Sequence, residues 1–306
     1  MIIIKDIVIL LVSIIVIGKG AVWLVDAAAR VAKHFGISEL VIGLTVVAFG
    51  TSAPEFGVTI LAAIRGMGDI SVGNIVGSNI FNLGFILGGT AIIHSLKTSR
   101  TVVFRDGIFL LFGGILLSVF LWDLTLSKIE GIILFTLLVL YLLYLYFKKE
   151  TVETEEPTHA MYRWDPILLF VGIGLVIVGS HFLVESAVSI ARFMGVSDWV
   201  IGATIIAAGT SAPEFATSLT AAMKSRYGMS VGNLIGSDIF NLFGVLGVAG
   251  IMRNLSVGID AQINLIILSF MIAVVLIFMR TGWVVSRKEG IILVMIGLLR
   301  WIYSFS

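Results

Sequence analysis

The sequence repeats itself within one chain. When it is shifted by 159 residues, the segment from Ser38 to Leu87 aligns without a gap on the segment from Ser197 to Leu246, and over half of the paired positions are identical. The identities are concentrated in Gly, Thr, Ser, Pro, Asn and Glu, so a shared bias toward apolar residues does not account for them. The chain is therefore a duplication, and we expect its two halves to fold alike.

Both copies lie in a strongly apolar chain. Hydrophobic residues make up 58% of the sequence and charged residues 13%, and the mean hydropathy is +1.11, whereas about a quarter of the residues in soluble domains are charged. Apolar windows of about 20 residues, long enough to cross a bilayer as helices, follow one another with short polar breaks. We predict an all-α integral membrane protein with ten transmembrane helices, near residues 6–32, 37–65, 70–95, 103–122, 127–147, 165–193, 197–225, 229–253, 260–280 and 286–305.

The repeated unit contains five spans, and five is an odd number. If the first copy enters the membrane from one side, the second enters from the other, so a pseudo-twofold axis in the membrane plane relates the halves, as in many secondary transporters. The predicted organisation is a first inverted repeat over residues 1–147, a linker over 148–164 and a second inverted repeat over 165–306. In this architecture, equivalent elements meet near the bilayer midplane, where ions bind.

Lysine and arginine residues predict the orientation, because short cytoplasmic loops are enriched in them. Placing the N-terminus outside puts more than twice as many of these residues in the inside connections as in the outside ones. Both termini are therefore predicted to be extracytoplasmic in a multi-pass protein of the cell membrane. The polar segment from Lys148 to Arg163 then becomes a solvated cytoplasmic linker.

Each copy carries the heptapeptide GTSAPEF in its second span, at Gly50–Phe56 and again at Gly209–Phe215. Glycine and proline both weaken a helix, since proline has no amide proton and clashes with the carbonyl four residues earlier. We therefore expect transmembrane helices two and seven to be broken here, with carbonyls around Ala48, Gly50 and Thr51 left without helical partners. A broken helix at membrane depth is tolerated where it lines a polar cavity.

The polar side chains around each break carry hard oxygen donors. The third span of each copy adds a second motif, GNIVGSNIFN in the first half and GNLIGSDIFN in the second, which supplies hydroxyl and amide oxygens. No histidine, cysteine or methionine recurs in these motifs, which argues against zinc, copper and iron. The candidate ligands are Thr51, Ser52, Glu55, Ser78 and Asn82 in the first copy and Thr210, Ser211, Glu214, Ser237 and Asn241 in the second.

Two of these candidates, Glu55 and Glu214, bring negative charge to the centre of a span. A carboxylate there costs on the order of 2.5 to 3.5 kcal/mol, and two facing each other also repel. One divalent cation, or two or more monovalent ones, would cancel the charge, and calcium suits these ligands because it takes about 6 to 8 oxygens in flexible geometry. Helix kinking and close packing would explain the proline and the glycines, but not two central glutamates in register.

The paired motifs GTSAPE and GN-x-x-GS-x-x-x-N in two halves resemble the alpha repeats of the cation/calcium antiporter superfamily, specifically its sodium/calcium exchanger branch in the prokaryotic form. The resemblance covers essentially all ten spans. In the proton/calcium branch the helix break instead tends to carry a GNxxE glutamate motif, whereas here the glutamate follows GTSAP.

The resemblance implies roles for the matching positions. Calcium would be held by Glu55 and Glu214 together with backbone oxygens of Thr51 and Thr210. Asn82 and Asn241 would lie near the central position. Sodium sites would use Ala48, Thr51, Ser52, Ser78, Glu214 and Ser237 on one side, and Ala207, Thr210, Ser211, Ser78, Glu55 and Ser237 on the other.

One position departs from the family pattern. Some relatives, including potassium-dependent ones, carry aspartate where this chain has Asn241. The centre is therefore expected to hold two acidic groups rather than three, and potassium dependence is not expected.

The resulting hypothesis is a secondary active antiporter that exchanges sodium for calcium by alternating access, with the ions bound at the midplane between Glu55 and Glu214. The alternatives are a proton/calcium antiporter of the same fold, a cation channel with acidic groups and an intramembrane enzyme. The enzyme is disfavoured, because the chain has no HExxH motif and no hydrolase-like serine and histidine spacing. The predicted partners are calcium ions, sodium ions and the lipid bilayer, without a cofactor or nucleic acid, and the oligomeric state is left open.

Overall fold

The computed structural model describes residues 2–148, 160–195 and 207–303 of the chain. These residues are mostly helical, with four two-residue strands among them. The helices of the first half are α1 (Ile2–Phe35), α2 (Glu39–Ile42), α3 (Ala48–Thr51), α4 (Ala53–Ile64), α5 (Gly68–Phe81), α6 (Gly88–Ile93), α7 (Ile108–Phe120) and α8 (Lys128–Phe147). Those of the second half are α9 (Asp165–Phe193), α11 (Ala207–Thr210), α12 (Ala212–Met223), α13 (Tyr227–Ile239), α14 (Leu246–Met252), α15 (Ile259–Arg280) and α16 (Arg287–Tyr303).

Short turns of other helical types continue several of these helices. The π-helical turns are η1 (Gly43–Val47), η2 (Asn82–Leu87), η3 (Val102–Gly107) and η6 (Phe240–Val245), and the 3₁₀ turn is η4 (Leu121–Asp123). Turns η2 and η6 follow α5 and α13 at matching places in the two halves. Single π-helical turns inside helices are frequent at functional sites.

Seven of the described helical stretches are long and apolar enough to cross a membrane. The bent pair Glu39–Thr51 and Ala53–Ile64, with 52° between its parts, makes an eighth candidate. These eight coincide with eight of the ten predicted spans. The span predicted near 197–225 begins outside the described residues, and the span predicted near 286–305 corresponds to α16, a helix of 17 residues.

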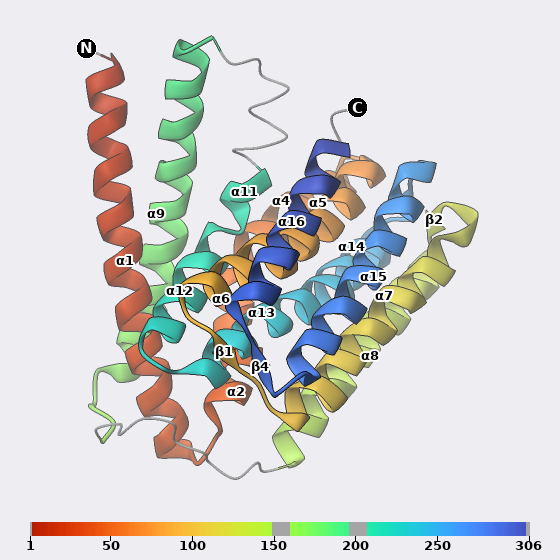
Figure 1. The fold of residues 1–306 in the computed structure, drawn as a ribbon. Coiled ribbons are helices and arrows are strands. Elements are labelled where there is room, and N and C mark those ends of the chain that lie inside the picture. The colour runs from red at the N-terminus through yellow and green to blue at the C-terminus, as the bar shows by residue number, and fades with distance from the viewer. Residues whose placement is uncertain (1, 149–159, 196–206, 304–306) are drawn as a thin grey trace.

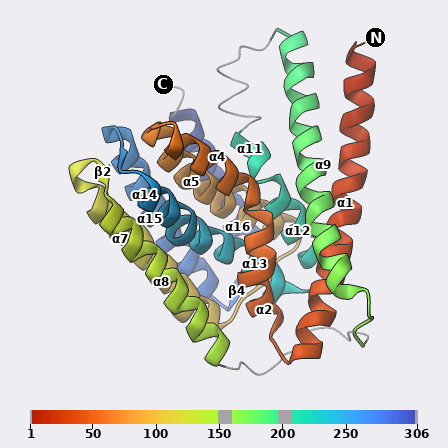
Figure 2. The same cartoon turned by 180° about the vertical axis from the view of Figure 1, so that it is seen from behind.

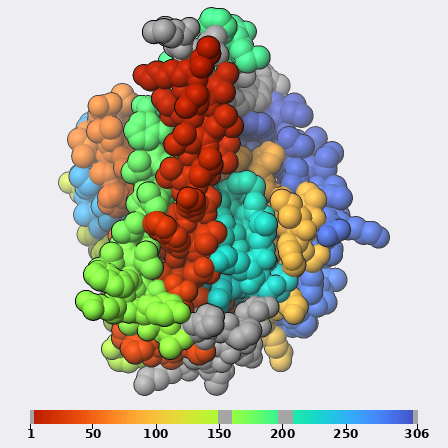
Figure 3. Space-filling view, turned by 90° about the vertical axis from the view of Figure 1, so that its left-hand side faces the viewer, coloured from red at the N-terminus to blue at the C-terminus, as the bar shows by residue number. Residues whose placement is uncertain are grey.

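Helices α1 and α9 lie side by side along one outer face of the molecule (Figure 3). Small residues allow the close approach: a Cβ atom on Gly172 would lie 2.7 Å from the backbone nitrogen of Leu24. Such contacts are common between membrane helices. At one end of the pair, Arg30 donates to both carboxylate oxygens of Asp165, at 2.9 and 2.7 Å. The two helices therefore form one unit.

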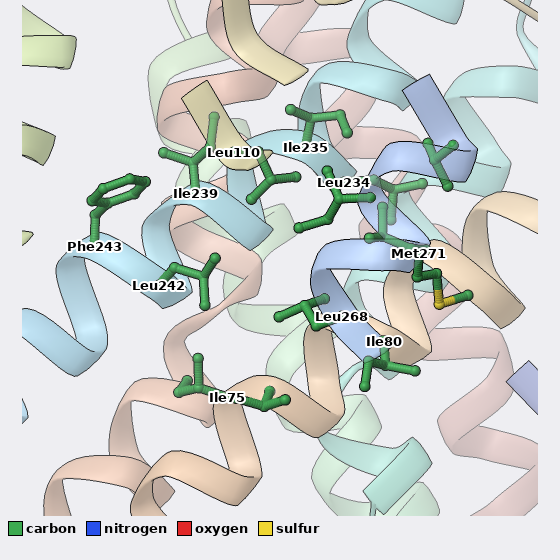
Figure 4. Close-up of a cluster of buried hydrophobic side chains, with 14 of the residues drawn as sticks. Ile75, Ile80, Leu110, Leu234, Ile235, Ile239, Leu242, Phe243, Leu268 and Met271 are labelled. Atoms are coloured by element: carbon green, nitrogen blue, oxygen red, sulfur yellow. The ribbon is translucent and has the colours of Figure 1, made fainter. Parts of the chain in front are cut away.

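Helices α5 and α13, with the turns that continue them, form the centre of the molecule. In the apolar window of Gly68–Ile93, 72% of the residues are buried, and in that of Tyr227–Met252, 83% are. The corresponding share is 28% for both α1 and α9. Their apolar side chains, such as Ile80 and Leu234, pack in one core cluster with Met271 of α15 (Figure 4). Seen from behind, α4, α5 and α13 lie between the α1–α9 pair and helices α7 and α8 (Figure 2). Polar groups on α5 and α13 are therefore held in a dry and closely packed setting.

Two short antiparallel strand pairs join the two halves. Strand β1 (Leu96–Lys97) pairs with β4 (Val284–Val285), and β2 (Thr125–Leu126) pairs with β3 (Leu255–Ser256). Each pair combines one strand from each half, and β3 and β4 follow β1 and β2 by the same 159 residues as the sequence repeat. The pairing is thus reciprocal.

The predicted helix breaks are present at both copies of GTSAPEF. Helix α3 ends at Thr51 and α4 begins at Ala53, with a proline in its first turn. In the second copy α11 ends at Thr210 and α12 begins at Ala212, again with a proline in the first turn.

One expectation about the first break is wrong. The carbonyl of Ala48 is not left without a helical partner, because it accepts a hydrogen bond from the amide of Ser52 at 3.0 Å. Proline at position 54 removes only the amide that would bond to Gly50, four residues earlier. The interruption is therefore shorter than the sequence suggests.

The first and last described helices have their outer ends on the same side of the molecule. Helix α1 starts and α16 finishes at the upper side of Figure 1, whereas α8 finishes and α9 starts at the lower side.

Candidate ion-binding site

Two carboxylates meet at the helix breaks, and each is hydrogen-bonded to the opposite half. The hydroxyl of Ser211 donates to Oε1 of Glu55 at 3.1 Å, and the hydroxyl of Ser52 donates to Oε1 of Glu214 at 3.0 Å. Because the serine and the glutamate of each half lie three residues apart, the four side chains close a ring across the two halves. All four are fully buried.

Two asparagines that the sequence analysis did not select support this ring. Nδ2 of Asn74 donates to the hydroxyl of Thr59 at 3.0 Å and to the main-chain carbonyl of the glutamate in its own half at 3.4 Å. Nδ2 of Asn233 contacts Ser218 at 2.9 Å and the corresponding carbonyl at 3.4 Å. Both asparagines belong to the repeated GN dipeptide, which was the available signal. They fix the first turn of α4 and of α12.

The two threonines at the breaks have different surroundings. Oγ1 of Thr51 lies within hydrogen-bonding distance of the Ala48 carbonyl at 3.3 Å, Oδ1 of Asn233 at 3.2 Å and Oγ of Ser237 at 3.4 Å. Oγ1 of Thr210 has no hydrogen-bond partner among the described residues, and this residue is half-buried. Thr51 therefore contacts α13 of the opposite half, whereas Thr210 makes no equivalent contact with the described residues of α5.

A cavity of about 760 Å³ reaches both breaks, because Pro54 of the first and Thr210 of the second line it. Thr210, Pro54 and His181 are among its lining residues, so it lies between α4, α9 and α11. A cavity of about 440 Å³ beside the first break is lined by Gly50 and by apolar side chains such as Phe170, and Thr51 does not line it. Thr210 therefore lines the larger cavity, whereas Thr51 lines neither of these two cavities.

Asp238 is a further buried acid, which the sequence analysis did not select, and it forms no group of three acids with the two glutamates among the described residues. Its carboxylate is fully buried, and its Oδ1 accepts a hydrogen bond from Nδ2 of Asn82 at 2.9 Å. Nδ2 of Asn241 donates to Oδ1 of Asn79 at 3.0 Å, and Nδ2 of Asn79 donates to the main-chain carbonyl of Asp238 at 3.1 Å. The predicted ligands Asn82 and Asn241 therefore belong to one network that crosses between α5 and α13.

The remaining predicted residues lie near these groups along the same elements. Ser78 and Ser237 are buried on α5 and α13. Ala48 is buried at the start of α3. Ala207 begins α11, and its side chain lies outside the described residues.

The region contains buried oxygens that have no hydrogen-bond partner among the described residues. Buried polar groups are nearly always paired, and leaving one unpaired costs about 1–3 kcal/mol. The described part of the chain has no group of three carboxylate or imidazole side chains that converge on one point. A bound cation would therefore complete its shell with hydroxyl, amide and carbonyl oxygens, as calcium does. The unpaired atoms are Oε2 of Glu55, Oε2 of Glu214, Oδ2 of Asp238, Oδ1 of Asn82, Oδ1 of Asn241 and Oγ1 of Thr210.

A helical membrane protein whose two halves contribute buried oxygen ligands for hard cations belongs to the class of cation transporters. The profile of the sodium/calcium exchanger protein family matches residues 5–147 and 164–301. The chain belongs to this family of multi-pass membrane antiporters and is not an enzyme. Its predicted family and transport class are confirmed.

Individual relatives cover nearly the whole chain. Sodium/calcium exchanger MaX1 of Methanosarcina acetivorans is 32% identical, over 94% of this chain and 95% of its own length. The putative antiporter CaxA of Alkalimonas amylolytica is 34% identical, over 93% and 94%. A solved structure of the sodium-calcium exchanger NCX_Mj, soaked with zero Na+ and Ca2+, is similar with a TM-score of 0.88 and 31% identity, covering 99% of this chain and 100% of that one.

Proposed function

We propose that this protein exchanges sodium for calcium across the cell membrane by alternating access, with the ions bound between Glu55 and Glu214. The observation that supports this most is the reciprocal ring: each glutamate accepts a hydrogen bond from the serine of the opposite half. The second carboxylate oxygen of each glutamate has no hydrogen-bond partner among the described residues. A cation at the ring would use these two oxygens and join the halves.

Charge explains why the two ions would compete for one cluster. Two carboxylates in a dry interior carry a net charge of −2, and one calcium ion or at least two sodium ions cancel it. Each uncompensated carboxylate would cost on the order of 2.5 to 3.5 kcal/mol at the bilayer centre. An empty cluster would therefore resist occlusion, and this penalty couples the movement of one ion to that of the other.

The division of ligands follows from the family resemblance. Calcium would use both glutamates with backbone oxygens of the two break threonines. Sodium would use the serine hydroxyls, one glutamate on each side and the carbonyls at the helix breaks, with Asn82 and Asn241 near the centre. The proposed sodium ligands are Ala48, Thr51, Ser52, Ser78, Glu214 and Ser237 on one side and Ala207, Thr210, Ser211, Ser78, Glu55 and Ser237 on the other.

The proposed architecture is a ten-helix inverted repeat, with residues 1–147 as the first repeat, 148–164 as the linker and 165–306 as the second. The crossed strand pairs and the reciprocal serine contacts support an equivalence of the two halves. The excess of lysine and arginine in the inside connections supports a cytoplasmic linker and extracytoplasmic termini.

The α1–α9 pair is the proposed moving element. It lies on the outside of the molecule (Figure 3), and its small-residue contacts and the Arg30–Asp165 pair hold its two helices to each other. Helix α9 also lines the cavity that reaches Thr210. Sliding of this pair across the core would open one break and close the other.

Reconstituted proteoliposomes test the proposal. Vesicles loaded with sodium and diluted into sodium-free medium should accumulate radioactive calcium, and an ionophore that collapses the sodium gradient should stop the uptake. The variant D260N, which removes an exposed carboxylate in the first turn of α15, is the matched control and should behave like the wild type.

Three results would contradict sodium coupling. Calcium uptake that ignores the sodium gradient would reject exchange. Uptake driven by a pH gradient without sodium would favour the proton/calcium alternative. Single-channel currents without coupling would favour a channel.

A further inference from the structure

A cavity of about 350 Å³ lies beside the strand pair β1–β4, and none of its lining residues belongs to the ring of serines and glutamates. It is lined by His94, Ser95, Lys97, Tyr227, Val284 and Arg287. His94 and Lys97 belong to the segment that leads from α6 into β1 in the first half. In the second half, Tyr227 begins α13 and Arg287 begins α16. The volume lies within the range of about 300–1,000 Å³ that is usual for small-ligand sites.

The basic side chains of this cavity are not balanced by a carboxylate. None of the ion pairs in the described part of the chain includes Lys97 or Arg287. The Nζ atom of Lys97 lies 5.5 Å from the centre of the Tyr227 ring. The Nη2 atom of Arg287 lies 3.5 Å from the main-chain carbonyl oxygen of Ile93. Two positive charges therefore meet at the cavity without an acidic partner among the described residues.

Arg287 stands where a helix disfavours positive charge. It is the first residue of α16, and the N-terminal end of a helix carries a partial positive charge of its own. Lys288 follows it directly. Glu289 offsets part of this charge, but its Oε2 is used to cap the helix, because it accepts hydrogen bonds from the amide and the hydroxyl of Ser286, both at 2.7 Å. A helix start of this kind favours a bound anion.

The equivalent place in the other half is built differently. Tyr227 corresponds to Gly68 in the repeat, and Lys97 corresponds to Ser256. A Cβ atom on Gly68 would overlap the main-chain oxygen of Ser256, so α5 and β3 are in direct contact there. Asp69, next to Gly68, adds a carboxylate that accepts a hydrogen bond from a main-chain amide beyond β3 at 2.7 Å. The repeat itself therefore requires neither the cavity nor its basic side chains.

The place of the cavity in the fold favours a phospholipid as the source of the anion. Strands β1 and β4 lie toward the lower side of Figure 1, where α8 ends and α9 begins, and the distribution of lysine and arginine predicts that this side is cytoplasmic. Trp283, directly before β4, lies with its ring centre 6.3 Å from that of Phe104, an exposed residue. Tryptophan is enriched at the level of the lipid headgroups, and basic pockets between membrane helices on the cytoplasmic side bind such headgroups.

We propose that this cavity binds a phosphate group, which an anionic phospholipid of the cytoplasmic leaflet supplies. The planar guanidinium of Arg287 matches the oxygens of a phosphate, and Lys97 adds a point charge. The hydroxyl of Ser95 and the pair of Tyr227 and His94, whose Oη and Nδ1 are 3.3 Å apart, offer polar groups to the remaining oxygens. Because the cavity is lined from both halves, a bound phosphate would stabilise their contact at β1–β4. The choice of leaflet rests on the proposed orientation, whereas the phosphate site does not.

Thermal unfolding of the purified chain in detergent tests this site. Short-chain phosphatidylglycerol should raise the melting temperature as its concentration increases, because a ligand that binds only the folded state stabilises it. Phosphatidylcholine of the same chain length should not, since its choline group cancels the negative charge. In the variant K97Q/R287Q the apparent affinity for phosphatidylglycerol should fall about 10- to 100-fold, the factor that corresponds to a lost hydrogen bond to a charged group. Both residues are exposed, so these substitutions leave the core intact.

The variant K5Q/K128Q is the matched control. It removes two positive charges from exposed residues at the starts of α1 and α8, on the upper side of Figure 1, and should keep the wild-type affinity. Inorganic phosphate is the second probe: stabilisation by phosphate but not by phosphatidylglycerol, lost in K97Q/R287Q, would reject the lipid as the source. Equal affinities of the wild type and K97Q/R287Q for phosphatidylglycerol, or no stabilisation by either probe, would overturn the site. These measurements require no sodium or calcium, so a failure of the proposed exchange would be distinct from a failure of this inference.

Discussion

The two helix breaks have the same seven residues and different surroundings. At the first, Thr51 is 1% exposed and contacts Asn233 and Ser237 of the opposite half. At the second, Thr210 is half-buried, lines the larger cavity and has no side-chain hydrogen bond among the described residues. The identical local sequence therefore determines which polar groups are present at each break. The packing of neighbouring helices determines which of these groups are accessible.

A second difference between the halves concerns ion pairs between the α1–α9 pair and the ends of the neighbouring helices, which we call the rim contacts. Asp26 of α1 pairs with Lys224, next to the end of α12, at 2.6 Å. The equivalent residues in the repeat are Glu185 and Arg65, but Glu185 contacts His181 at 3.4 Å, and Arg65 takes part in no ion pair among the described residues. The structure thus contains one of two equivalent contacts among the described residues.

The largest effect is expected where the halves are most alike. E55Q and E214Q should each reduce sodium-driven calcium uptake by more than about 100-fold, beyond the loss seen when only the support of a metal site is removed. Each variant deletes half of the ring's negative charge. Uptake by reconstituted vesicles is the measurement, with D260N as the control. Near-normal calcium uptake in either variant would show that the two carboxylates do not bind the same transported ion.

The serines that bridge the ring come next. S52A and S211A each remove one hydrogen bond to a buried carboxylate, which is worth about 1.5–3 kcal/mol for a charged acceptor, or roughly 10- to 100-fold in affinity. The apparent calcium affinity should fall by similar factors in both variants. A loss in only one of them would mean that the reciprocal contacts differ in function.

Replacing the threonine at each helix break should affect the stability of the folded protein differently in the two halves. T51A removes contacts to the opposite half and should lower the stability of the folded protein by about 1 kcal/mol. T210A removes a hydroxyl without a hydrogen bond among the described residues and should leave stability nearly unchanged. Thermal unfolding in detergent, without sodium or calcium, compares the two. Equal losses would show that the structural difference between the breaks does not persist in solution.

The rim pair should give the smallest effect. Asp26 and Lys224 are about one third exposed, at 31% and 32%, and such pairs contribute about 0–1 kcal/mol. D26N should therefore change uptake by no more than roughly fivefold, which is the factor that corresponds to the upper end of this range. The chain has no cysteine, so paired cysteines report proximity cleanly. A disulfide between D26C and K224C and one between R65C and E185C should form under different ion conditions, and simultaneous formation of both would contradict alternation.

Sequence reasoning found the ring because its residues carry their own signal. A glutamate, a proline and two hydroxyls repeated at membrane depth indicate a broken helix and a charged centre without any structure. It did not identify Asn74, Asn233 or the contact of Asp238, because motif letters do not show which helix face meets the opposite half. It was wrong about Ala48, because one proline interrupts one hydrogen bond and the next turn remains intact. The end of the tenth helix and the start of the seventh remain predictions.

The strand pairs β1–β4 and β2–β3 fasten each half to the other through main-chain hydrogen bonds, with β1 and β4 toward the lower side of Figure 1 and β2 toward the upper side. A hinge motion that separated the two halves on one side of the molecule would break the strand pair on that side. The core is therefore better suited to act as a stationary frame. The proposed sliding of α1 and α9 would leave both strand pairs intact.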